Sequence, residues 1–181
     1  RLLYLFHSEY EQMAKRKKRK KETWKKQFTY EIIGLSLLSL AIIGLAELGM
    51  VGRAVQQLTQ LFAGEWYFFI FLSLIVCSVY FMWKRTTPPL WSRRLVGWYI
   101  VYFAILMLSH VHLFRLLSNE GRWQDTSVIR NTWQLFWMKV TGEAPNTDLG
   151  GGMIGAVGFA FFYLLFDADG TMLIGIVFLL V

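Results

Sequence analysis

The residues that could do chemistry are few, and their spacing is poor for it. Ser109 and His110 are adjacent, so on a helix they point about 100° apart and cannot pair as nucleophile and base. His110 and His112 share no helical face, and no third ligand follows at a metal-binding spacing. Asp167 and Asp169 favour a solvated turn over a metal motif. The sequence therefore predicts no catalytic residue and no metal site.

Nucleotide and thiol chemistry are also disfavoured. No G-x-x-x-x-G-K-[ST] phosphate loop occurs, and no lysine follows the glycines at 150–158, so we predict no cofactor site in this chain. Cys77 is the only cysteine and lies in an apolar run, which excludes a disulfide within the chain and disfavours a redox role.

Basic residues are concentrated near the start of the chain. Residues 13–29 contain nine Lys or Arg and one acid, whereas residues 30–181 balance nine basic against nine acidic side chains. Each basic residue near an anionic membrane surface contributes about 1 kcal/mol of attraction, and DNA phosphates are the alternative partner. We predict that this leader is cytoplasmic and contacts anionic lipid through Lys15, Arg16, Lys17, Lys18, Arg19, Lys20 and Lys21.

Apolar runs of membrane-spanning length follow the leader. The chain is 55% hydrophobic and 17% aromatic, more than a soluble domain carries, and the runs at about 32–51, 66–83 and 95–114 predict three spans. The first is too long, and lacks the cleavage site, for a secretory signal peptide. Residues 84–94 hold four basic residues and no acid, so the positive-inside rule assigns them to the cytoplasm and residues 52–65 to the outside.

Two segments between the runs are amphipathic. Val51, Val55, Leu58 and Phe62 recur at helical spacing and predict a short helix on the outer surface with its apolar side in lipid. In the second segment the apolar row is Ile129, Trp133, Phe136, Trp137 and Val140, and Gly142 with Pro145 ends the pattern. This second row predicts either an interfacial helix or a partner-binding face.

The C-terminal part contains a glycine-rich apolar segment at 149–166 and a fresh apolar run from 171 that continues to Val181. Because the chain stops inside that run, we expect more chain to follow. Small residues spaced four apart let helix backbones approach closely. This spacing predicts helix packing in an interface between subunits, through Gly151, Gly152, Gly155 and Ala156. The alternative is that these small residues only loosen a shallow helix.

Five motifs together carry a resemblance to a known family. They are Met13-Ala-Lys-Arg-Lys-Lys-Arg19, Phe62-Ala-Gly-Glu-Trp66, Leu108-Ser-His-Val-His-Leu-Phe114, Val128-Ile-Arg-Asn-Thr-Trp-Gln-Leu-Phe136 and Asp148-Leu-Gly-Gly-Gly-Met-Ile-Gly-Ala156. From residue 13 onward the chain resembles the N-terminal membrane domain of FtsK/SpoIIIE-type DNA translocases, and most of all the sporulation member. Residues 1–12 have no counterpart, which makes Met13 the expected start.

The resemblance implies a multi-pass protein of the bacterial cell membrane at the division septum. It implies a downstream hexameric motor that uses ATP and Mg, and self-association of this domain, with division proteins as further partners and DNA handled mainly by the motor. Because that motor must be cytoplasmic, one C-terminal apolar segment does not cross. We favour the glycine-rich one as a re-entrant or interfacial helix, and the reverse assignment stays open.

The predicted fold class is therefore an all-α membrane protein: a helical bundle of three complete spans, a glycine-rich re-entrant or interfacial helix and the start of a fourth span. Two functions follow. One is an anchoring and assembly domain of a septal DNA translocase, and the other is an independent small transporter or channel subunit. Spans two and three contain no Asp, Glu, Lys or Arg, which disfavours a substrate or ion pathway.

Overall fold

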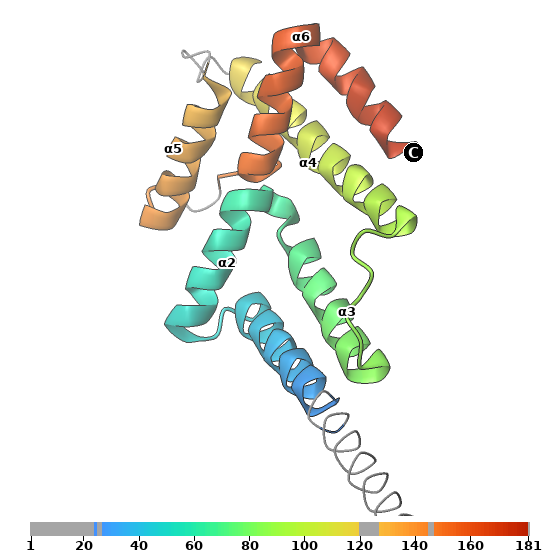
Figure 1. Cartoon of the computed structure of the whole chain (residues 1–181). Helices are drawn as coiled ribbons and strands as arrows, with labels where there is room; N and C mark the ends of the chain where they lie inside the picture. Colours follow the sequence, from blue (N-terminus) through green and yellow to red (C-terminus); the bar gives the residue numbers. More distant parts are fainter. Residues whose placement is uncertain (1–23, 25–26, 120–126, 145–146, 181) are drawn as a thin grey trace, which may run out of the picture. The chain divides into compact units, whose positions relative to one another are not determined.

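The computed structural model describes residue 24 and residues 27–119, 127–144 and 147–180. The described residues form helices and no strand, so the predicted all-α class is confirmed. In chain order the elements are a first helix Gln27–Leu45, α2 Gly49–Ala63, the 3-10 helix η1 Gly64–Trp66, α3 Phe68–Lys84, α4 Arg93–Asn119, α5 Val128–Thr141 and α6 Gly152–Leu179 (Figure 1).

The chain divides into two compact units. Unit one contains residues 1–39 and 74–88, and unit two contains residues 40–73 and 89–181. In unit one the first helix packs on the end of α3, because Gly34 has no side chain and the hydroxyl of Ser78 donates to its carbonyl at 2.6 Å. Arg85 pairs with Glu31 at 2.6 Å in the same unit.

Three helices are long and apolar enough to cross a membrane: Gln27–Leu45, Arg93–Leu117 and Gly152–Leu179. The predicted second span, α3, has 17 residues and passes the same test only together with α2 and η1, from which it is bent by 111°. The described residues therefore fit a membrane bundle, with α3 as half of a bent pair.

The first helix begins and ends earlier than the predicted span 32–51. It ends in a Schellman motif, in which the amide of Leu48 donates to Ile43 and the amide of Glu47 donates to Gly44. Glu47 occupies the left-handed position (φ 54°) that glycine usually takes. Because the residue there is not glycine, composition gives no sign of the break, and the apolar run appears continuous into α2.

The glycine-rich segment and the final apolar run are joined in α6. The helix is broken at Asp167, whose φ of 58° and ψ of −175° are not helical, and Figure 1 shows the two arms turning there. At about 1.5 Å per residue, arms 152–166 and 168–179 would measure roughly 18–22 Å, short of the ~30 Å hydrocarbon core. The second arm begins near residue 168, earlier than the predicted 171.

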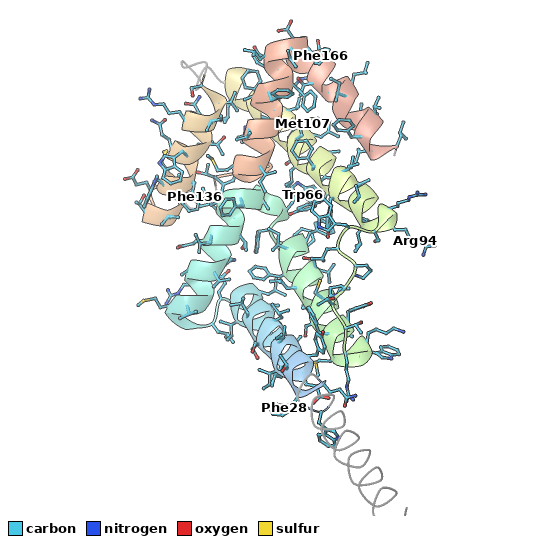
Figure 2. All side chains as sticks on the ribbon, in the orientation of Figure 1. Phe28, Trp66, Arg94, Met107, Phe136 and Phe166 are labelled. Carbon is cyan, nitrogen blue, oxygen red and sulfur yellow. The ribbon has the colours of Figure 1, made fainter. Side chains whose placement is uncertain are left out.

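The apolar core of unit two lies where α4, α5 and α6 meet. Met107, labelled in Figure 2, and Val111 come from α4, Val128 from α5, and Ala156 and Phe159 from α6. Both arms of α6 contact α4, since Gly155 faces Leu106 and Gly175 faces Leu108. The two arms of α6 therefore form a hairpin that packs against one long helix, α4.

Candidate assembly and membrane-contact sites

The predicted helix-packing residues lie against α4 of the same chain. Gly151 and Gly155 are buried, and a Cβ atom would lie 1.9 Å from the Leu106 carbonyl oxygen at Gly151 and 2.5 Å from it at Gly155. Only residues without a side chain permit this contact between backbones. Ala156 is fully buried in the core of unit two. A role of these residues between subunits stays a prediction.

Gly152 belongs to a second close contact, which the sequence did not indicate. It adopts a left-handed φ of 61°, and a Cβ there would lie 2.4 Å from the amide nitrogen of Gly64. Gly64 has a φ of 59° and faces Gly150 in the same way, and the amide of Glu65 donates to the Gly150 carbonyl at 3.0 Å. These glycines form a joint between η1 and the start of α6.

A buried polar contact connects α4 to α5. His110 and Thr132 are 0% and 1% exposed, and the imidazole Nε2 lies 3.3 Å from the Thr132 hydroxyl. That hydroxyl also donates to the Val128 carbonyl of its own helix at 2.9 Å. His110 is therefore buried inside the protein, between α4 and α5. His112, two residues on, is exposed.

Polar contacts at η1 complete the joint. The Lys139 ammonium of α5 lies 2.7 Å from the Glu65 carboxylate, and the Tyr102 hydroxyl of α4 donates to the Trp66 carbonyl at 3.1 Å. No pattern in the sequence indicates these partners, because they are 74 and 36 residues apart along the chain. They connect η1, α4 and α5 around the glycines.

Apolar side chains face outward on α2. Val51, Leu58 and Phe62 are 65%, 56% and 51% exposed, while Gly52 and Gln56 are buried. The Gln56 amide donates to the Glu47 carboxylate at 2.7 Å. The predicted amphipathic helix is present. Most of its apolar row is exposed, but Val55 is half-buried beside Gly44, and of its polar residues Gln56 faces the protein whereas Arg53 is exposed.

The predicted lipid-contact residues Lys15, Arg16, Lys17, Lys18, Arg19, Lys20 and Lys21 lie outside the described residues. The described sites act through packing. The glycines let helix backbones approach closely, and apolar side chains of α2 face away from the protein.

Comparison with known proteins shows which family the chain resembles. The chain is 50% identical over 161 residues to the DNA translocase FtsK of Halalkalibacterium halodurans, and 43% identical over 167 residues to the DNA translocase SpoIIIE of Bacillus subtilis. These matches cover 88% and 92% of the chain. The resemblance to FtsK/SpoIIIE-type DNA translocases is confirmed. The higher identity to an FtsK protein does not support a preference for the sporulation member.

The matches cover only part of these relatives. The chain spans about a fifth of their length, 20% of the first and 21% of the second. The same holds for the DNA translocase FtsK of Bacillus cereus, which is 43% identical over 170 residues. No family model matches the chain, and no solved structure matches it.

Proposed function

We propose that this chain is the membrane-anchoring and assembly domain of a septal DNA translocase. With a C-terminal ATPase motor, the complete protein would move chromosomal DNA across the closing septum in division or sporulation. The observation that carries the proposal is the 50% identity to a DNA translocase FtsK over 88% of the chain. The first helix and α4, which are unbroken candidate spans, support an anchoring role.

The motor is expected in the part of the protein that corresponds to the remaining four-fifths of the relatives. The gene downstream of codon 181 gives the first test. A linker followed by a phosphate-loop ATPase supports the proposal, whereas a stop codon at that point contradicts it and favours an independent transporter or channel subunit.

Assembly can be tested with the chain itself. Expressed in trans in cells that carry the complete protein, the chain should enter mixed oligomers and leave chromosomal DNA trapped by closing septa. A fluorescent fusion to the chain should concentrate at those septa. Uniform membrane fluorescence together with normal chromosome segregation would contradict the septal assembly role while leaving an anchoring role in place.

The proposed orientation has the N-terminus in the cytoplasm, as the basic residues indicate. Single cysteines at positions 57 and 88, in a Cys77→Ala background, test it with a membrane-impermeant maleimide on intact cells. We expect labelling at 57 and protection at 88. Positions 20 and 146 extend the test to residues outside the described ones, with protection expected at 20 and labelling at 146.

A further inference from the structure

The side chains of helix α5 form three rows along its surface. Val128, Thr132 and Phe136 form the buried row. Beside it runs an apolar exposed row of Ile129, Trp133 and Trp137, which are 40%, 43% and 48% exposed. Opposite the buried row, at about 100° per residue, lie the exposed polar residues Arg130, Gln134 and Thr141.

The helix is held in place by contacts at both ends. Thr132 bonds His110 of α4, and Lys139 pairs with Glu65 of η1. Val128 packs in the core with residues of α4 and α6. Because α4 is a candidate membrane span and α6 is an apolar hairpin packed on it, a helix fixed to both of them has its outer face next to the bilayer.

The rows restrict the depth at which α5 can lie. Its 14 residues are too few to cross a ~30 Å hydrocarbon core, and a polar row containing an arginine disfavours burial among acyl chains. The large apolar rings of Trp133 and Trp137, which the rest of the protein leaves partly uncovered, disfavour a position of α5 in water. The boundary between headgroups and acyl chains satisfies both rows, since tryptophan is enriched there.

The surface beside the indoles has the same mixed character. Trp133 and Trp137 lie nearly edge to face, with ring centroids 5.9 Å apart and planes at 79°. They line an open hollow of about 500 Å³ whose other walls are Gln134, Met138, Thr141 and Glu143. Aromatic walls and a polar rim match a surface that meets both lipid headgroups and the upper acyl chains.

We propose that α5 is a membrane-interface helix whose Trp133 and Trp137 sit among lipid headgroups. The occupant of the exposed apolar row is the bilayer surface itself, reached about 5–10 Å into the headgroup boundary as other amphipathic helices do. The contact rests on the membrane insertion that the proposed function also requires, but it does not depend on a motor, on DNA or on assembly at a septum.

The chain reconstituted in phosphatidylcholine vesicles tests this with single cysteines carrying an environment-sensitive fluorophore, in a Cys77→Ala background. Ile129→Cys and Trp133→Cys report on the apolar row, and Arg130→Cys and Gln134→Cys are the matched controls. In the apolar row we expect roughly twofold stronger quenching by a nitroxide on acyl carbon 5 than by one on carbon 12, and in the polar row quenching by aqueous iodide.

Three outcomes would overturn the proposal. Iodide quenching of both rows would place α5 in water, stronger quenching from carbon 12 would place it in the hydrocarbon, and protection of the apolar row from both quenchers would show that protein covers it. A second measurement avoids cysteines. Trp133→Phe/Trp137→Phe should remove part of the tryptophan quenching by shallow brominated lipids.

Discussion

The inner and outer sides of unit two use opposite kinds of side chain. On the inner side Gly151, Gly155 and Gly64 have none, and backbones meet directly. On the outer side of α5, Trp133 and Trp137 are among the largest side chains and are nearly half exposed. In a membrane protein apolar burial does not distinguish inside from outside, because lipid is as apolar as a core. Close approach of helix backbones does distinguish them, so small residues mark the surfaces at which helices of the protein contact one another.

The largest expected effect comes from filling the glycine face. Gly151→Leu/Gly155→Leu places side chains where even a Cβ would collide with the Leu106 carbonyl. The cost should exceed the roughly 1–3 kcal/mol of ordinary overpacking, seen as loss of cooperative unfolding in a detergent titration. Gly97→Leu, on the open side of α4, should be neutral or stabilising, because glycine costs about 1 kcal/mol in a helix.

The same double variant separates two roles of these glycines. A folded monomer with fewer crosslinked higher-order species would show that the face serves a contact between subunits, and it would break the comparison drawn above.

The joint at η1 gives the next largest effect. Gly64→Ala combines a left-handed φ of 59° with a Cβ 2.1 Å from the Gly150 carbonyl oxygen, whereas Gly142→Ala has a φ of 80° and open space. Gly142→Ala should lose only about 1–2 kcal/mol from its left-handed backbone. Gly64→Ala should lose clearly more in the same detergent titration. Equal losses would mean that the contact with Gly150 adds nothing.

Two threonines of α5 sharpen the comparison further. Thr132→Val removes a buried hydroxyl that bonds both His110 and Val128 and should destabilise by about 1–3 kcal/mol. Thr141 is exposed, and its hydroxyl bonds the carbonyl of Trp137 on its own helix, so Thr141→Val should change the unfolding free energy little. Thermal unfolding in detergent compares the two, and similar midpoints would contradict a structural role for the buried contact.

The smallest effect is expected from the ion pairs. Lys139 is 20% exposed and Glu65 is 44% exposed, so a double-mutant cycle with Lys139→Met and Glu65→Gln should give a coupling of about 0.5–1 kcal/mol. Arg115 also pairs with Asp169, but that carboxylate is 96% exposed, and its coupling should be smaller and vanish at about 1 M salt. A larger coupling energy for Arg115 and Asp169 than for Lys139 and Glu65 would contradict this expectation.

Local features of the chain were predictable because they depend on neighbouring residues. The apolar lengths near α4 and α6, the termination of α5 at Gly142 and the small-residue spacing of Gly151 and Gly155 all follow from periodicity and backbone freedom. The end of the first helix was not, since Glu47 takes a position that composition assigns to glycine.

The sequence by itself determined that this is an all-α membrane chain with amphipathic connections, because hydrophobic length and helical period are properties of contiguous residues. Only the tertiary structure decided which backbone the glycines approach, that Gly64 faces Gly150, and that His110 is buried against Thr132. These contacts join residues far apart in the chain. Their geometry depends on how whole helices pack, which no local pattern specifies.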